Sequence, residues 1–313
     1  MDWNTKFLLA LEKVRTPFLD TLFSIITVLG EETFFIVIGI IFFWCINKKE
    51  GYYLLTVGFM GTVINRFLKQ LFCIPRPWVK EPSLTAVESA KAEATGFSFP
   101  SGHTQSAVGI FASVARWNKS HALRIICIVL CLLVPFSRLY LGVHTPTDVI
   151  ASSLIALVLA FLFYPIVKRA YESPRGTHVL FAAMLLFTIG ALTFNALHVF
   201  PVDVDAERLL DSEKNLYKML GCICGLWVSF VIDLKYTRFE TKAPLGAQFL
   251  KVILGLIPLI LIKTFLKEPL YILIGNESVA DGIRYLLMTG FASIIWPLTF
   301  PFITKLFAKI LKK

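Results

Sequence analysis

Long stretches without a charged side chain constrain this chain most. Three blocks, 149–167, 179–202 and 285–304, contain no Asp, Glu, Lys or Arg. Uncharged apolar stretches of about 18 or more residues are typical of helices that cross a bilayer. Hydrophobic residues make up 56% of the chain and charged residues only 17%, whereas soluble domains carry about 25% charged residues. The sequence therefore predicts an all-α, polytopic helical membrane protein with no separate soluble domain.

The apolar pattern predicts nine spans, at 32–47, 51–72, 101–117, 122–140, 147–167, 177–198, 215–233, 246–266 and 282–302. The first six form a predicted core, residues 32–198. The last three belong to a C-terminal addition, residues 199–313, to which the sequence assigns no role. Residues 1–31 hold two short amphipathic stretches, Phe7–Val14 and Phe18–Leu29. These either lie in the membrane interface or form one imperfect crossing.

The basic residues fall on alternate loops. A net charge of +10 would suggest nucleic acid in a soluble protein, but the cations cluster at 48–49, 116–124, 168–175, 235–242 and 305–313. An excess of Lys and Arg marks cytoplasmic loops. The loops 73–100, 137–146, 199–214 and 267–281 are then predicted to face the outer side, and no nucleic-acid partner is expected.

Neither the cysteines nor the acidic loop indicates a metal site. The six cysteines lie in or beside apolar segments without the spacing of metal ligands. Residues 201–213 carry five acids, Asp203, Asp205, Glu207, Asp211 and Glu213. Their spacing is irregular, and such runs are mostly solvated, so a cation site is the less favoured interpretation.

Three short motifs on the predicted outer side carry the polar chemistry. The first contains Lys69, Arg76 and Pro77; the second is Pro100, Ser101, Gly102 and His103; the third contains Ser137, Arg138, His144 and Asp148. Charged residues at membrane depth are costly and are usually functional. The motifs occupy the ends of four different predicted helices, so the sequence predicts that these ends gather at one site.

The cations of these motifs suit an anion. Arg76 and Arg138 can each bind two oxygens of a phosphate through a planar guanidinium, and Lys69 adds a point charge. For Lys69 alone, an anchor at the edge of a span is an equally good interpretation. Two arginines beside histidine-bearing motifs make that interpretation less favoured for the set.

Two of the motifs have the residue pattern of a helix N-terminus. Ser101 suits an N-cap, and Gly102 lets the backbone approach a ligand at the positive end of the helix. His103, one step further, is placed to reach a leaving-group oxygen.

In the third motif, Thr145 suits the N-cap and Pro146 the first helical position. Asp148 can then cap the helix, or accept a hydrogen bond from His144 and leave the other imidazole nitrogen as a nucleophile.

With these residues in view, the chain resembles the type 2 phosphatidic acid phosphatase superfamily. That family has the pattern K-x6-R-P, then P-S-G-H, then S-R-x5-H-x3-D, and all eleven fixed positions are present between Lys69 and Asp148. The resemblance covers about a quarter of the chain. Three spans follow the six-helix core that the smallest family members have, and a nine-span arrangement also resembles the glucose-6-phosphatases.

The resemblance implies roles for individual residues. His144 would attack phosphorus and form a phosphohistidine, Asp148 would orient His144, and His103 would protonate the leaving alcohol. The phosphate-binding residues would be Lys69, Arg76, Ser101, Gly102, Ser137 and Arg138. No metal and no cofactor are implied, because fixed cations neutralise the phosphoryl oxygens.

The expected substrate is an amphiphilic lipid phosphate or polyprenyl diphosphate, bound at the outer face of a membrane, with a bacterial cytoplasmic membrane as the favoured location. Two alternatives would use the same residues, a lipid phosphotransferase and a sugar phosphatase. The predicted spans argue against a soluble vanadium haloperoxidase, and the complete motif argues against a transporter or scaffold that only binds phosphate. The sequence does not indicate an oligomeric state.

Overall fold

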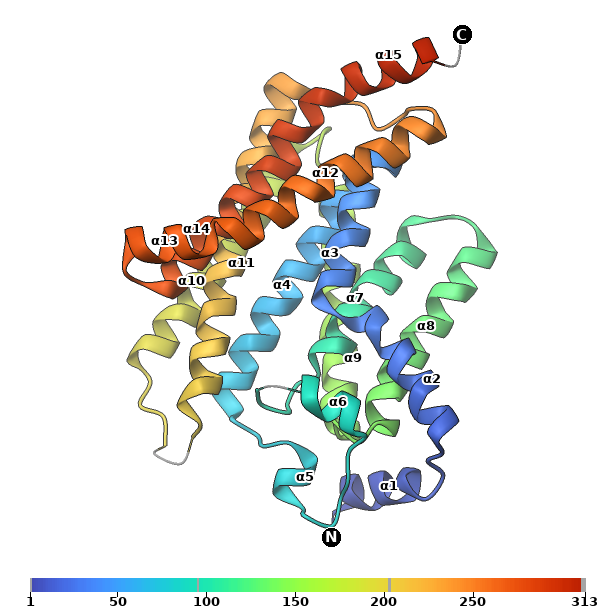
Figure 1. Cartoon of the computed structure of the whole chain (residues 1–313), viewed down its shortest axis with the longest axis vertical. Coiled ribbons are helices and arrows are strands. Elements are labelled where there is room, and N and C mark those ends of the chain that lie inside the picture. Colours follow the sequence, from blue (N-terminus) through green and yellow to red (C-terminus); the bar gives the residue numbers. More distant parts are fainter. Residues whose placement is uncertain (1, 95, 202–203, 311–313) are drawn as a thin grey trace. The chain divides into compact units, whose positions relative to one another are not determined.

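The computed structural model describes residues 2–94, 96–201 and 204–310, and every regular element within these ranges is a helix. The α-helices are α1 Trp3–Glu12, α2 Pro17–Thr27, α3 Glu32–Ile41, α4 Lys48–Phe72, α5 Pro77–Lys80, α6 Glu88–Glu93, α7 Gly102–Trp117, α8 His121–Tyr140, α9 Pro146–Lys168, α10 Pro174–Leu197, α11 Ala206–Ile232, α12 Leu245–Phe265, α13 Lys267–Ile274, α14 Glu277–Gly290 and α15 Phe300–Ile310 (Figure 1). The short 3-10 and π segments are η1 Val28–Gly30, η2 Phe42–Ile46, η3 Asp233–Thr237, η4 Phe291–Ile295 and η5 Trp296–Thr299. The predicted all-α class is confirmed.

All nine predicted spans coincide with helical segments. Within the described residues, six helices are long and apolar enough to cross a membrane, and a seventh candidate is the bent pair Pro17–Gly30 and Glu32–Ile46. The protein is thus a polytopic membrane protein. α4 and α7 fall outside this set for different reasons. α4 carries Arg66 and Lys69, whereas the 16 residues of α7 extend only about 24 Å, less than a typical hydrocarbon core.

The chain divides into two compact units. Unit 1 comprises Met1–Ile36, Met60–Tyr164 and Asn195–Ser212, and it holds every residue of the three motifs. Unit 2 comprises Val37–Phe59, Pro165–Phe194 and Glu213–Lys313. The functional site described below lies within unit 1.

In unit 1, α7 and α8 form a closely packed hairpin (Figure 1). α2 packs on α8, and η1 packs on α7. Arg15 fastens this N-terminal segment, since its Nε donates to the Tyr140 carbonyl at 2.9 Å and its Nη1 donates to the Thr85 carbonyl at 2.9 Å. The turn after α8 needs Gly142, which has φ +75° and would place a Cβ only 2.5 Å from Arg15 Nη2.

In unit 2, α12 packs against α13, α14 and α15. A buried carboxylate is fully paired here: Asp233 accepts from Lys48 Nζ at 2.8 Å, from Thr237 Oγ1 at 3.0 Å and from the Tyr171 hydroxyl. Burial raises the pKa of Tyr171, which therefore stays a hydrogen-bond donor.

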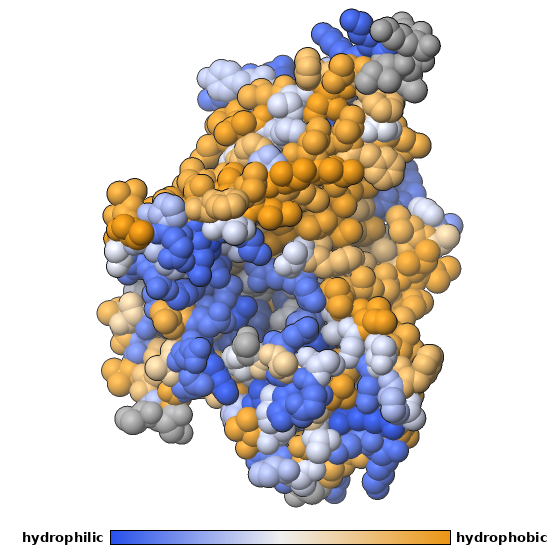
Figure 2. Space-filling model, in the orientation of Figure 1, coloured by the Kyte–Doolittle hydropathy of each residue, from blue (hydrophilic) through white to orange (hydrophobic). Residues whose placement is uncertain are grey.

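Apolar side chains cover broad surfaces of α8 in unit 1 and of α12 in unit 2 (Figure 2). On α8 the exposed fractions are 62% for Ile125 and 67% for Leu132, and on α12 they are 67% for Phe249 and 61% for Ile260. Soluble monomers rarely expose contiguous apolar patches of this kind, so these faces suit contact with lipid.

One predicted boundary is wrong. The acidic run was expected to be loop, yet α11 begins at Ala206, because Asp205 accepts a hydrogen bond from the Glu207 amide at 3.0 Å and starts the helix. Asp205 also pairs with Arg208, and Asp203 lies outside the described residues.

Candidate active site

The motif residues lie at helix ends that meet in unit 1. Lys69 is in the last turn of α4, Arg76 is the N-cap of α5, and Arg138 is in the last turn of α8. Ser101 is the N-cap of α7, as predicted, and accepts a hydrogen bond from the Thr104 amide at 3.4 Å. His144 lies two residues before α9. The predicted gathering of four helix ends is confirmed for these positions.

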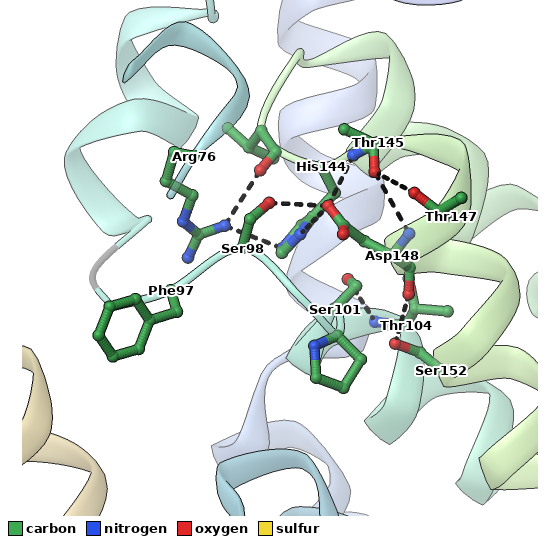
Figure 3. A network of polar contacts seen from close by, with 12 residues as sticks. Arg76, Phe97, Ser98, Ser101, Thr104, His144, Thr145, Thr147, Asp148 and Ser152 are labelled. Atoms are coloured by element: carbon green, nitrogen blue, oxygen red, sulfur yellow. Dashed lines mark hydrogen bonds and ion pairs between the residues drawn. The ribbon is translucent and has the colours of Figure 1, made fainter. Parts of the chain in front are cut away.

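The imidazole of His144 lies between a guanidinium and a carboxylate (Figure 3). Its Nε2 is 3.0 Å from Nη1 of Arg76, and its Nδ1 is 3.5 Å from Oδ2 of Asp148. A guanidinium can only donate, so Nε2 accepts and the proton of the neutral ring resides on Nδ1. The side chain of His144 is 2% exposed. The residue thus presents a lone pair on Nε2, as a nucleophile requires.

Asp148 is held by groups other than His144. Its Oδ2 accepts from Ser98 Oγ at 2.7 Å and from the Thr145 amide at 2.8 Å. In return, Thr145 Oγ1 accepts from the Asp148 amide at 3.3 Å, which completes a reciprocal cap at the start of α9. The two roles considered for Asp148 in the sequence therefore coexist, because the carboxylate caps the helix and also faces His144.

Charge and burial set the ionisation of His144. The pKa of His144 is held well below its usual range, first by burial and next by the charge of Arg76. The ring is therefore neutral at physiological pH. Burial, and then the like charge of Arg138, lowers the pKa of Arg76. Two buried guanidiniums close to each other favour the binding of an anion.

The remaining cations are also anchored. Lys69 donates to the Phe97 carbonyl and lies 3.5 Å from the Ser98 carbonyl. Arg138, 1% exposed, donates from Nη1 to Thr27 Oγ1 at 2.7 Å, while its Nε has no partner among the described residues. The Nε2 of His103 is likewise buried without a partner in the described part of the chain. A buried hydrogen-bonding atom without a partner destabilises the folded protein, and a bound ligand supplies the missing partner.

These groups surround a cavity of about 140 Å³. This volume is many times the roughly 10–15 Å³ that one water needs, so a phosphoryl group fits. The lining residues are Gly30, Glu32, Thr62, Asn65, Arg66, Lys69, Arg76, Glu93, Ala94, Gly102, His103, Gln105, Ser106, Arg138 and His144. The lining thus contains both histidines and four permanent cations.

Two of the predicted phosphate-binding residues are not part of this lining. Ser137 donates from Oγ to the Val134 carbonyl of its own helix at 2.6 Å. Ser101 caps α7, and its amide donates to the Asp148 carbonyl at 3.3 Å, so its N–H is already engaged. The backbone of Gly102 does reach the cavity. The predicted role of Ser137 in phosphate binding is not supported by its position, and Ser101 acts on the site through the helix start.

Other residues of the site were not predicted. Asn65 lies one helical turn before Lys69 on α4, and this i, i+4 spacing could have identified it. Ser98, which donates to Asp148, carries no such signal. Gly30 lies in the N-terminal segment against His103, and a Cβ there would be 2.8 Å from the His103 carbonyl oxygen. Gly30 and Glu32 therefore form part of one wall of the site.

No group of three or more His, Cys, Asp or Glu side chains is arranged to hold a metal ion in the described ranges 2–94, 96–201 and 204–310. The carboxylate of Asp211, in the acidic run, instead pairs with Arg66 at 3.3 Å.

Fold and site together define a helical membrane protein with a buried, cation-lined cavity that contains two histidines. Residues 50–172 match the family model of the PAP2 superfamily, and residues 217–307 match that of the PAP2 superfamily phosphatase, transmembrane extension. The chain belongs to the PAP2 superfamily.

Its relatives include three named phosphatases. A probable sphingosine-1-phosphate phosphatase of Dictyostelium discoideum is 34% identical over 47% of this chain and 38% of its own length. The undecaprenyl-diphosphatase BcrC of Bacillus subtilis is 34% identical over 38% of this chain and 58% of its own length. The phosphatidylglycerophosphatase B of Bacillus subtilis is 29% identical over 48% of this chain and 75% of its own length. The chain thus matches about half of the length of the first two relatives.

Proposed function

We propose that this chain is an integral membrane phosphatase. It hydrolyses a lipid phosphate or a polyprenyl diphosphate at the outer face of the membrane, through a phosphohistidine and without a metal ion. The observation that carries the proposal is the position of His144, whose Nδ1 lies 3.5 Å from Asp148 and whose Nε2 lies 3.0 Å from Arg76. His144 and Arg76 line the same cavity as His103. The names of the relatives, all phosphatases of phosphorylated lipids, support the same class of substrate.

In the first step, Nε2 of His144 attacks phosphorus and the bond between phosphorus and the lipid oxygen breaks. Arg76 must first break its hydrogen bond to Nε2 and donate to a phosphoryl oxygen instead. A bound phosphate dianion favours the protonated form of His103, which gives a proton to the leaving oxygen, so the lipid departs as an alcohol. Asp148 stabilises the charge that develops on the His144 ring.

In the second step, water attacks the phosphohistidine. His103, now neutral, takes a proton from that water, and the bond between phosphorus and Nε2 breaks. Inorganic phosphate leaves, while His144 is restored and His103 is again protonated. Both steps pass through a five-coordinate phosphorus whose oxygens carry negative charge, and the fixed donors of Lys69, Arg76 and Arg138 stabilise it without a metal.

The charge distribution supports an outward-facing site. The basic turn between α7 and α8, residues 116–124, is assigned to the cytoplasm by the positive-inside rule. His103 lies in the first turn of α7 and Arg116 in its last turn, which supports a site at the opposite membrane surface. We assign the protein to a bacterial cytoplasmic membrane with the site facing outward, where an amphiphile keeps its tail in lipid while its phosphate enters the cavity.

Phosphate release from a substrate panel tests this proposal. The panel contains phosphatidic acid, phosphatidylglycerophosphate, undecaprenyl diphosphate, sphingosine phosphate and glucose 6-phosphate, presented to the purified protein with and without a chelator. We expect release from at least one lipid without an added acceptor, unaffected by the chelator and absent in His144→Ala. Release only with an acceptor would indicate a phosphotransferase, and release from glucose 6-phosphate alone would indicate a sugar phosphatase.

A further inference from the structure

A second hollow lies in unit 1, at the far end of α7 from the active site. It is an apolar groove of about 530 Å³ between α7, α8 and α9, and we call it the α7–α9 groove. The residues that carry the argument are Ala112, Arg116, Arg124, Ile128, Leu132 and Phe161, all of which line it. Thirteen residues of helix separate His103 from Arg116, which corresponds to about 20 Å. The groove is thus distinct from the phosphate cavity.

The walls of the groove face outward from the helix bundle. The exposed fractions are 55% for Ile128, 67% for Leu132 and 58% for Phe161. These side chains lie on two of the candidate spans, α8 and α9. Exposed aliphatic and aromatic side chains around a hollow at hydrocarbon depth suit an acyl chain rather than a polar ligand.

Two arginines close one end of the groove. The guanidinium of Arg116 stacks 4.0 Å from the ring centroid of Tyr164, which fixes the orientation of its planar face. Arg124 is fixed at Nε, which donates to the carbonyls of Ala115 at 3.2 Å and Asn118 at 2.8 Å. The terminal nitrogens of both side chains are therefore held in place beside the apolar walls.

Neither arginine has an acidic partner in the described part of the chain. The sequence explains why, since residues 101–147 contain no Asp or Glu, and the first carboxylate, Asp148, belongs to the active site. The turn from α7 to α8 also contains Lys119, so this end of the two helices is purely cationic. It lies away from α6 in Figure 1.

We propose that the α7–α9 groove binds an anionic glycerophospholipid of the membrane, with an acyl chain along Ile128, Leu132 and Phe161 and the headgroup phosphate between Arg116 and Arg124. Juxtamembrane cations attract anionic lipids, and an arginine fork binds phosphate oxygens in a defined geometry. In the predicted topology the groove belongs to the cytoplasmic leaflet, so its lipid is not the substrate, whose phosphate enters from the other side. This binding site does not depend on the phosphatase activity.

The experiment uses spin-labelled phosphatidylglycerol and spin-labelled phosphatidylcholine with the full chain in phosphatidylcholine vesicles. We expect the motionally restricted population of phosphatidylglycerol to exceed that of phosphatidylcholine. Orthovanadate, which occupies the phosphate cavity, should not reduce this restricted population. In the double variant Arg116→Gln/Arg124→Gln, the excess of restricted phosphatidylglycerol should fall at least tenfold. Its matched control, Arg169→Gln/Arg175→Gln, removes two cations of another basic loop and should keep it.

A further pair of variants separates binding from folding. Arg116→Lys/Arg124→Lys keeps both charges and should retain part of the excess, whereas Ala112→Phe fills the groove and should remove it with both arginines intact. The proposal is overturned if both lipids are restricted equally, or if the double Gln variant equals its control. It is also overturned if orthovanadate displaces the lipid, or if the groove is the contact of a dimer that the Gln variant dissociates.

Discussion

Nη1 of Arg76 and Nε2 of His144 lie 3.0 Å apart, and their hydrogen bond fixes the tautomer of the histidine. The guanidinium lies on one side of the ring and Asp148 on the other (Figure 3). In the proposed mechanism, Arg76 occupies the position at Nε2 that a phosphoryl group takes in the first step.

The pH dependence follows from the ionisation of His144. Its pKa is lowered by burial and by Arg76, so the neutral, nucleophilic form persists as the pH falls and is lost only well below the ordinary value of about 6.5. We expect the acidic limb of kcat/KM, which reports the unbound enzyme, to lie clearly below pH 6.5. In Arg76→Gln the limb should move to higher pH as activity falls. An unchanged limb in this variant would contradict the assigned cause.

Ser98 positions Asp148 through its 2.7 Å hydrogen bond to Oδ2. Ser98→Ala removes a hydrogen bond to a charged acceptor, which is worth about 1.5–3 kcal/mol. We expect kcat to fall by roughly ten- to a hundredfold with little change in KM, because Ser98 acts on the orientation of His144 rather than on substrate binding. Steady-state kinetics on a soluble phosphate ester measure this split.

Ser137→Ala is the matched control for Ser98→Ala. The Ser137 hydroxyl bonds its own helix and does not line the cavity, so the variant should retain nearly full activity. A raised KM in this variant would instead restore the phosphate-binding role that the sequence motif suggested.

The local parts of the site could be predicted from the sequence. Ser101 and Thr145 were identified as N-caps because capping depends on residues within one turn, and the pairing of His144 with Asp148 also spans only four positions. The walls from distant segments could not be predicted. Gly30 and Thr27 reach the site only because η1 packs on α7 and α2 packs on α8, and no spacing in residues 1–31 records those contacts.

Gly30 gives a test of the N-terminal wall. A Cβ at this position would meet the His103 carbonyl oxygen at 2.8 Å and Val134 Cγ1 at 2.9 Å, so Gly30→Ala must displace the start of α7 or the wall itself. We expect a loss of activity on lipid phosphates of about tenfold or more, and a smaller loss on p-nitrophenyl phosphate, whose leaving group needs no proton from His103.

The control for this variant is Gly190→Ala on α10, where a Cβ meets nothing within 4 Å. It should leave both activities unchanged. Equal losses on the two substrates in Gly30→Ala would show that the glycine acts on overall packing and not on His103.

Two carboxylates, Glu32 and Glu93, line a cavity that otherwise favours anions. Glu93 adds a negative charge to the lining that Arg138 also belongs to, and this charge repels an incoming phosphate. Glu93→Gln should therefore lower KM for a diphosphate more than for a phosphate whose lipid carries an amine near the phosphate. The ratio of kcat/KM for undecaprenyl diphosphate and sphingosine phosphate measures this shift.

Glu88→Gln, on the same short helix α6 but paired with Lys91, is the control and should not change that ratio. A ratio that shifts equally in both variants would mean that the overall charge of α6, rather than the lining carboxylate, sets the preference.

The central claim is that Nε2 of His144 becomes bonded to phosphorus. The most direct measurement is rapid acid-free quenching of the enzyme with a ³²P-labelled lipid phosphate, followed by mapping of the labelled residue. We predict an acid-labile, alkali-stable phosphate on His144, formed and lost at rates that account for turnover, and absent in a monodisperse His144→Ala variant. Label on another residue, or normal phosphate release by His144→Ala, would contradict the account.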